Sequence, residues 1–119
     1  MIQKNSILKP VDSCGVYKVK VFHVYKGAQG RLAFTGDFIK CSARLVKPEN
    51  SVKKKSKHRS ILIKTVFINL RLDGSFIKFK QNGVVLLKKR LTPKGATLKG
   101  PVFHYLKRKK FISSFSRSI

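Results

Sequence analysis

The feature of this sequence that most constrains its fold is an alternation of apolar and polar residues in short runs bounded by turn-forming residues. In the run from Val16 to Tyr25, Tyr17, Val19 and Val21 alternate with Lys18 and Lys20; in the run from Asp37 to Val46, Ile39, Cys41, Ala43 and Leu45 alternate with Lys40, Ser42 and Arg44. A period of two places successive side chains on opposite faces of a strand, whereas a helix needs a period of about 3.6. Both runs are therefore predicted to be half-buried strands.

The rest of the chain extends this pattern and then departs from it. Residues 60–70 are apolar and β-branched, which predicts a central strand buried on most of both faces. Turn signals at 72–75 and 81–83 bound further strands at 76–79 and 84–87, so three short strands are expected to meet at two hairpins. After Lys88-Lys89-Arg90, Pro and Gly predict irregular structure, and residues 103–116 favour short helices.

These elements indicate a mainly β fold, a small barrel or a sandwich, with a C-terminal appendage. The length fits a single domain over residues 1–119, with the barrel at about 1–90 and the appendage at about 91–119. Side chains fill the interior of so small a barrel and leave no ligand cavity. Function is therefore expected on the loops and the outward strand faces.

The net charge of the chain further restricts its possible functions. The chain has 28 Lys and Arg against 4 Asp and Glu, a formal charge of +24 at pH 7. Such self-repulsion calls for a polyanion, either a nucleic-acid backbone or an anionic membrane surface, and no long amphipathic helix supports the membrane. The acids Asp12, Asp37, Glu49 and Asp73 lie far apart beside turn formers or Pro, so no carboxylate pair for acid–base catalysis is expected. An enzyme is not predicted.

Cysteine and histidine spacing gives no sign of a metal or a cofactor. Cys14 and Cys41 form no CxxC motif, and they are expected to be two reduced thiols. None of His23, His58 and His104 has metal-ligand spacing, and no P-loop or dinucleotide motif is present. Repulsion from the lysines around it is expected to disfavour the charged form of His58.

The candidate phosphate contacts are Lys and Arg side chains in one loop and on strand faces. The loop contains Lys53, Lys54, Lys55, Lys57 and Arg59, and the strand positions are Lys18, Lys20, Lys40, Arg44, Lys64 and Lys78.

The nine Phe residues allow either core packing or base stacking. Core packing is predicted for those in strand patterns, which are Phe22, Phe38, Phe67, Phe76 and Phe79. Four aromatics outside the barrel pattern are expected to pack the appendage against the barrel or a neighbouring protein: Phe103, Tyr105, Phe111 and Phe115.

One motif resembles that of a known family. The chain carries Ser60-Ile61-Leu62-Ile63, Asp73-Gly74, Phe79, Asn82 and Val85-Leu86, and this pattern is similar to the signature of the ribosomal protein L14 family, with Ser60 in place of the usual Gly or Ala. Further landmarks in the family's order run from Met1-Ile2-Gln3 to Gly100-Pro101-Val102, so the resemblance covers nearly the whole chain.

The resemblance implies a closed five-stranded β-barrel with a protruding basic β-ribbon or loop and short C-terminal helices. It implies a structural role in the large ribosomal subunit, with large-subunit rRNA and neighbouring ribosomal proteins as partners, bridges to small-subunit rRNA, and in some members a silencing factor that blocks subunit joining. By position in the family, the loop at 53–57 and Lys107, Arg108 and Lys110 become rRNA or bridge contacts.

Residue usage and the N-terminus bear on the compartment and on the alternatives. Abundant Lys, Phe and Ile fit translation from an AT-rich genome, and the first residues resemble neither a secretory signal nor an organelle presequence. We therefore expect a mitochondrially encoded protein in the mitochondrial ribosome, with a plastid or a bacterial cytoplasm as the alternative. The alternative function is a free single-stranded nucleic-acid chaperone on an OB-like barrel, which requires outward aromatics on a strand face.

Overall fold

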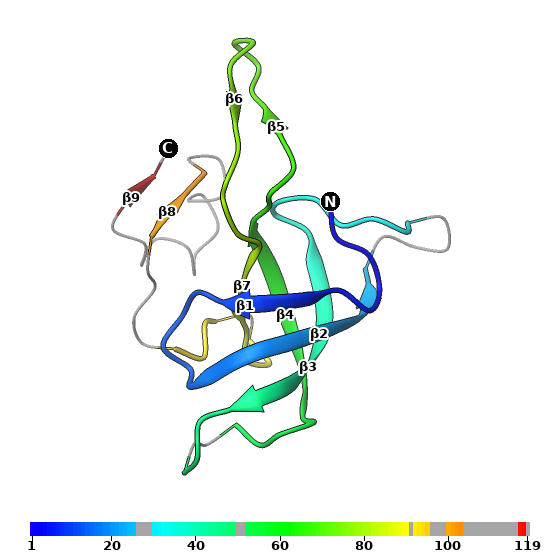
Figure 1. The fold of residues 1–119 in the computed structure, drawn as a ribbon, viewed down its shortest axis with the longest axis vertical. Coiled ribbons are helices and arrows are strands. Elements are labelled where there is room, and N and C mark those ends of the chain that lie inside the picture. Colours follow the sequence, from blue (N-terminus) through cyan, green and yellow to red (C-terminus); the bar gives the residue numbers. More distant parts are fainter. Residues whose placement is uncertain (26–29, 50–51, 91, 96–99, 104–116, 119) are drawn as a thin grey trace.

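Five strands close into a barrel in the computed structural model, which describes residues 1–25, 30–49, 52–90, 92–95, 100–103 and 117–118. In barrel order they are β1 (Ile7–Pro10), β2 (Val16–Val24), β3 (Phe38–Val46), β4 (Lys57–Lys64) and β7 (Gly83–Leu86). Neighbouring strands are antiparallel except for the closing pair of β1 and β7, which is parallel (Figure 1). The predicted closed barrel is confirmed.

Inward side chains from all five strands fill the barrel. Leu8, Val19, Ile39, Leu62 and Val84 are each almost completely buried and belong to one hydrophobic cluster. Burial of each such side chain stabilises the fold by roughly 1.5–3 kcal/mol relative to its exposure to water. The barrel is thus a packed frame.

A second cluster covers the outer face of β4 and β7. Ile61, Ile63 and Val85 point away from the barrel interior and pack with Val102 and Phe103. Phe103 is buried, and its ring meets that of Phe79 edge to face, with centroids 5.4 Å apart. The prediction that Phe103 packs the appendage against the barrel is therefore confirmed.

The central strand predicted over residues 60–70 is correct in burial only for its first residues, and it is wrong at both ends. Lys57 and Arg59, which were predicted in the basic loop, lie in β4, because this strand begins at Lys57. Ser60 to Ile63 are buried on both faces, but β4 ends at Lys64, and Val66, Phe67 and Ile68 are exposed. Where the chain leaves the barrel, the side chain of Asn82 accepts a hydrogen bond from the Val66 N–H at 2.9 Å. The composition of residues 60–70 alone does not show that the chain leaves the barrel after Lys64.

Two positions in the alternating runs point outward, contrary to prediction. Tyr17 and Leu45 are half-exposed, where the alternation placed them on the buried faces of β2 and β3. The register between these strands shifts around Lys18. A β-bulge inserts an extra residue into one strand and reverses the facing of its neighbours.

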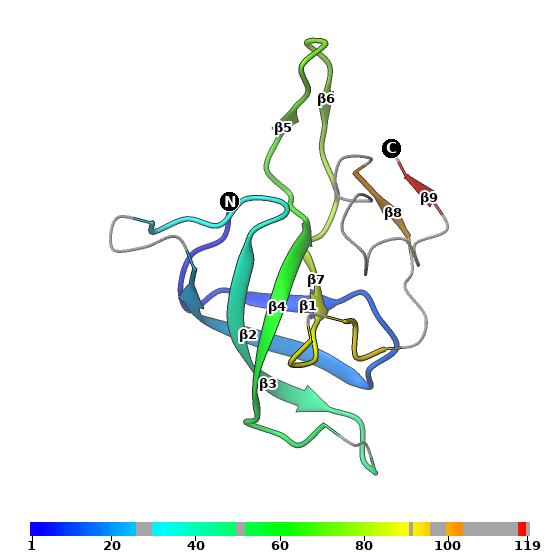
Figure 2. The ribbon, with the colours of Figure 1, turned by 180° about the vertical axis from the view of Figure 1, so that it is seen from behind.

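The protruding ribbon is formed by β5 (Asn69–Leu70) and β6 (Phe76–Ile77), which pair antiparallel (Figures 1 and 2). At its tip, Asp73 accepts hydrogen bonds from the Ser75 N–H and hydroxyl, and Gly74 adopts a positive φ of 89°. The two-hairpin prediction is wrong, because β6 does not pair with β7, which instead closes the barrel between β4 and β1.

The core assignment of the strand aromatics is wrong for three of the five. Phe22, Phe67 and Phe76 are exposed, whereas Phe38 and Phe79 are partly buried and pack against the second cluster. Phe67 and Phe76 lie beyond the barrel, in the ribbon and the segment that leads to it. Phe22 follows the buried Val21 on β2 and therefore faces outward, as regular alternation requires.

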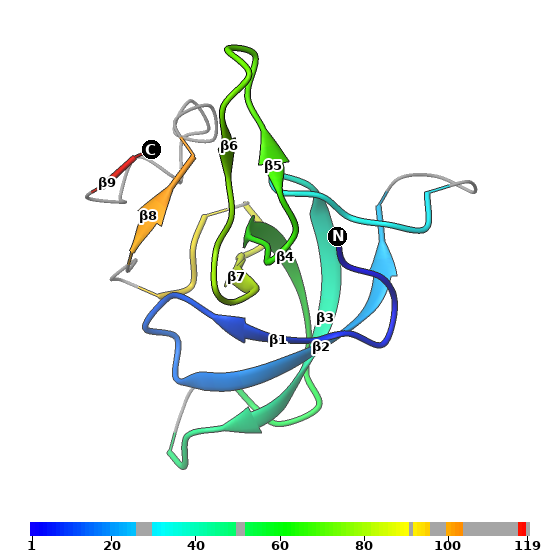
Figure 3. The ribbon, with the colours of Figure 1, turned by 45° about the horizontal axis from the view of Figure 1, so that its top comes forward.

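The C-terminal region is described only in part. β8 (Pro101–Val102) pairs parallel with β9 (Arg117–Ser118), and this pair lies beside the ribbon (Figure 3). The helices predicted within 103–116 lie outside the described residues apart from Phe103, as do Tyr105, Phe111 and Phe115. No helix of sufficient length and hydropathy to cross a membrane occurs in the part of the chain that the structure describes.

Candidate nucleic-acid interface

The predicted cations gather on the outer face of β2, β3 and β4. Strand register places His23 opposite Lys40 and Lys40 opposite Arg59, so three basic residues form one row across the sheet. Ser42 pairs with both Lys20 and Lys57 in a neighbouring row. Lys18 and Arg44 are exposed near the other end of the same strands. The alternation of apolar and polar residues therefore correctly placed Lys18, Lys20, Lys40 and Arg44 on the outward strand faces.

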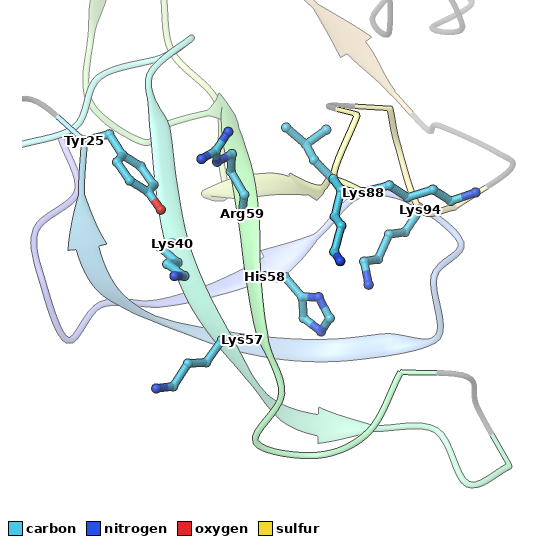
Figure 4. Close-up of a pocket in the computed structure, with 9 residues that line it drawn as sticks. Tyr25, Lys40, Lys57, His58, Arg59, Lys88 and Lys94 are labelled. Atoms are coloured by element: carbon cyan, nitrogen blue, oxygen red, sulfur yellow. The ribbon is translucent and has the colours of Figure 1, made fainter.

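A basic groove of about 480 Å³ lies over this face (Figure 4). We define it by its lining residues: Tyr25, Lys40, Lys57, His58, Arg59, Leu87, Lys88, Lys89 and Lys94. Six of the nine are Lys or Arg, and these described lining residues include no Asp or Glu. Cations converging on one concave surface from three parts of the chain create a strong positive potential for a phosphate backbone.

Backbone hydrogen bonds fix the wall of the groove that Leu87, Lys88, Lys89 and Lys94 form. The Leu87 N–H donates to the Arg59 carbonyl oxygen at 2.9 Å, which attaches this segment to β4. The Lys88 N–H donates to Thr92 at 2.7 Å, and the Lys94 N–H donates to Leu86 at 2.9 Å. These bonds fix the backbone of Lys88 and Lys94 relative to β4 and β7.

The histidine of the groove has a lowered basicity. His58 Nε2 and the Ser56 hydroxyl oxygen are 2.7 Å apart. Burial lowers the pKa of His58 below its usual value of 6.5, and the positive charge of Lys94 lowers it further. The predicted direction is confirmed, but burial is the larger cause and the repelling lysine comes from a distant part of the sequence.

Aromatic rings lie among these cations. The Arg59 guanidinium carbon is 5.3 Å from the centroid of the Tyr25 ring, and Lys57 Nζ is 5.8 Å from that of Phe22. The rings of His23 and Tyr25 meet edge to face at 4.7 Å. These separations are within the range of cation–π attraction, so the rings orient the charges beside them.

The basic loop, which we define as residues 52–56, extends the positive surface beyond the groove. Val52 is buried and anchors the loop to the barrel, whereas Lys53, Lys54 and Lys55 are exposed. The Lys55 N–H donates to the Ala43 carbonyl oxygen at 2.8 Å, which holds the lysines at the end of the barrel opposite the β5–β6 ribbon (Figure 1).

The remaining predicted sites lie apart from the groove. Lys78 is exposed just after β6. Lys64 is partly buried, with its Nζ 5.8 Å from the centroid of the Phe79 ring, and burial lowers its pKa. Lys107, Arg108 and Lys110 lie outside the described residues.

Sequence reasoning missed Tyr25, Lys88, Lys89 and Lys94 as parts of the groove. The Lys88-Lys89-Arg90 run was a visible signal, but only the pairing of Leu87 with Arg59 shows which surface it joins. The sequence around Tyr25 did not indicate that its side chain faces the groove. That direction follows from the register shift between β2 and β3, which only the structure shows.

Two of the four acids organise turns: Asp37 accepts a hydrogen bond from the Phe34 N–H at 2.6 Å, and Asp73 accepts one from the Ser75 N–H at 3.0 Å. Asp12 instead joins distant segments, because it accepts a hydrogen bond from the Gly95 N–H at 3.4 Å. Burial raises the pKa of Asp12. Among the described residues, no three His, Cys, Asp or Glu side chains gather as a metal site.

Both cysteines are free and buried. Burial raises the pKa of Cys14 to about 12, with a further contribution from Asp12, and burial raises that of Cys41 to about 11. The Cys41 sulfur and the Ser60 hydroxyl oxygen are 2.9 Å apart. Thiols held in their protonated form behave as small core residues.

Two comparisons with known proteins agree with this geometry. The model of the family described as ribosomal protein L14p/L23e matches residues 1–118. A curated relative named large ribosomal subunit protein uL14m, from Tetrahymena pyriformis, is 47% identical over 119 residues, and the match covers 100% of both chains.

Proposed function

This chain belongs to the ribosomal protein L14p/L23e family, and we propose that its basic groove and basic loop hold large-subunit rRNA through phosphate contacts. It is a structural constituent of the large subunit of the mitochondrial ribosome, with large-subunit rRNA and other ribosomal proteins as its partners. The family is one of structural ribosomal proteins and is not an enzyme class. The alternative of a free single-strand chaperone is not supported by these matches.

The observation that carries the proposal is the convergence of six Lys and Arg side chains on the basic groove, with no acid among its described lining residues. Cations that neutralise phosphates release counterions, so the salt dependence of RNA affinity at such a surface grows with its number of phosphate contacts. Backbone contacts fix position without reading sequence, and the groove therefore recognises the shape of folded rRNA.

The candidate contacts divide by location. The basic loop with Lys57, Arg59 and Lys40 forms the main contact, and Lys18, Lys20 and Arg44 extend it along β2 and β3. Lys78 makes a separate contact beside the ribbon. Lys107, Arg108 and Lys110 contact rRNA or form the bridge to the small subunit. The domain proposal is a single unit over residues 1–119, with a barrel at about 1–90 and an appendage at about 91–119.

The test of the main contact measures affinity for a large-subunit rRNA fragment against salt concentration. A variant with Lys53, Lys54, Lys55 and Lys57 all replaced by Gln is expected to keep the barrel and to show a shallower salt slope, by about 0.7–0.9 for each lost phosphate contact. Its incorporation into large subunits is expected to fall. An unchanged slope together with unchanged incorporation would contradict the proposal.

Bridging and regulation are separate parts of the proposal. Large subunits that carry Gln at 107, 108 and 110 are expected to join small subunits more slowly, as followed by light scattering. The same variant, added to a binding assay with a subunit-joining silencing factor, tests whether this factor docks on the appendage. Normal joining rates would remove these residues from the bridge.

A further inference from the structure

We propose that Arg59 and Tyr25 form a stacking site for one unpaired RNA base at the end of the basic groove. This inference rests on the proposed rRNA contact and adds a preference for a bulged or looped nucleotide. The groove would then recognise a structural feature of the RNA, beyond its charge.

The first step is the outward direction of the aromatics at the end of β2. The register between β2 and β3 shifts between Val21 and His23, so Phe22 is an additional residue without a regular partner. After this shift Phe22 and His23 are both exposed, Val24 is buried, and Tyr25 is exposed over 40% of its surface. The bulge therefore places rings on the strand face that carries the cations.

The second step is the arrangement of Arg59. Its guanidinium group points toward Tyr25 in Figure 4, with its carbon 5.3 Å from the ring centroid. Cation–π attraction to Tyr25 restricts this long side chain before RNA arrives. A guanidinium plane is one of the surfaces on which splayed-out RNA bases stack. The ordering cost of binding is therefore reduced.

The third step is the position of the phosphate-binding lysines. Lys40 lies next to Arg59 across the β3–β4 pair, and Lys88, Lys89 and Lys94 line the opposite wall of the groove. A base stacked on Arg59 therefore has cations on both sides for its flanking phosphates. The volume of about 480 Å³ lies within the roughly 300–1,000 Å³ of typical small-ligand sites.

The last step is the ability of the site to distinguish unpaired from paired RNA. Bases within an A-form duplex are stacked on one another and are not available to a side chain, whereas bulges and loops can present a free base. Phosphate contacts alone would bind both kinds of RNA. The Arg59–Tyr25 pair therefore predicts discrimination between RNAs of equal charge.

The experiment compares two RNA hairpins with equal numbers of phosphates, one with a bulged purine in its stem and the other with a fully paired stem, each titrated with the full-length chain. Stacking of one base corresponds to a preference of roughly 5- to 100-fold. Arg59→Lys keeps the charge and removes the planar group, and Tyr25→Leu removes the ring that orients it. Both variants are expected to lose most of the preference while their salt slopes remain close to that of the wild type.

Two controls make the result specific. Tyr25→Phe retains the ring and is expected to retain the preference. Lys89→Gln is expected to lower the salt slope by about 0.7–0.9 and to retain the preference. Circular dichroism of each variant shows whether the barrel is intact.

The two proposals fail in different ways. Equal affinity of the wild type for both hairpins with a steep salt slope would overturn the stacking site and leave the phosphate contact in place. A nearly flat salt dependence for both hairpins would overturn the phosphate contact itself. Full retention of the preference by Arg59→Lys would also overturn the stacking site.

Discussion

Two hairpin connections project from opposite ends of the barrel, and their surfaces are of opposite kinds (Figures 1 and 2). The β3–β4 connection carries the basic loop, whose lysines are exposed around the single buried anchor Val52. The β5–β6 ribbon presents apolar side chains instead, with Leu70 79% exposed, Leu72 fully exposed and Phe76 64% exposed. One barrel thus presents a charged surface at one end and an apolar surface at the other.

The two ends differ in the source of the binding free energy that each would gain on assembly. The lysines of the basic loop are well solvated in the free protein and gain from counterion release on RNA. The ribbon exposes leucines whose burial against another surface is worth roughly 1.5–3 kcal/mol each. The ribbon tip is therefore expected to gain from burial against an apolar surface, and the two ends are expected to respond oppositely to salt.

The largest expected effect breaks the frame beneath both ends. Leu62 is completely buried in the barrel, and Leu62→Ala is expected to lower the free energy of unfolding by about 2–5 kcal/mol, through lost burial and the cavity that remains. Urea denaturation followed by circular dichroism measures this change. The matched control is Leu72→Ala at the ribbon tip, which is expected to change stability by less than about 0.5 kcal/mol.

The next prediction concerns the apolar end alone. Leu70→Ser combined with Leu72→Ser is expected to leave the urea midpoint unchanged, because both side chains are exposed in the free protein. The free energy of binding to the large subunit is expected to weaken by up to about 3 kcal/mol for each leucine that a neighbour buries. Retention of the protein on large subunits is therefore expected to fall. Sedimentation after a high-salt wash measures retention. Equal retention of the variant and the wild type would show that the ribbon tip has no apolar partner.

The charged end gives a smaller and salt-dependent effect. Replacement of Lys88, Lys89 and Lys94 by Gln is expected to lower the salt slope of rRNA binding by about two to three. Replacement of Arg71, Lys78 and Lys80 by Gln removes the same charge beside the ribbon. This second variant is expected to change the salt slope by less. Filter binding at several salt concentrations measures both slopes. Equal losses would mean that net charge, and not the groove, determines affinity.

The smallest expected effect is a pH dependence confined to the basic end. Because the pKa of His58 is lowered in the fold, the unfolded chain takes up this proton first, so stability is expected to decrease slightly as pH falls below about 6.5. RNA phosphates favour the charged imidazole, so affinity is expected to rise a few-fold over the same range. His58→Gln is expected to remove both trends. Urea midpoints and RNA affinities at pH 5.5 and 7.5 test this, and parallel trends in the two would contradict it.

Local patterns in the sequence were sufficient for most of the barrel. Alternation located β2 and β3 to within a residue at each end, and turn residues located the ends of the ribbon tip at 72–75. The resemblance of the Ser60 to Leu86 region supplied the closure into five strands. Alternation placed Lys40 on an outward strand face, whereas Lys57 and Arg59 were predicted in a loop and lie at the start of β4.

The failures share a physical cause. Tyr17 and Leu45 were assigned to buried faces because a period of two assumes regular pairing, and the β2–β3 register shifts interrupt it. Phe22 was assigned to the core as an aromatic within a strand pattern, although it lies on the outward face of β2. Phe67 and Phe76 were assigned to the core because their segment is apolar, although it projects from the barrel. Hydrophobicity indicates that a residue needs a partner, and it does not indicate whether that partner belongs to the same chain.

The sequence by itself determined the β class, the excess of positive charge and the turn positions, because these depend on residues close together in the chain. Only the tertiary structure decided which cations share a surface. The Leu87–Arg59 hydrogen bond brings Lys88, Lys89 and Lys94 to the face that β2, β3 and β4 present. Contacts between distant segments are set by barrel closure and packing, which no local pattern of charge or hydrophobicity specifies.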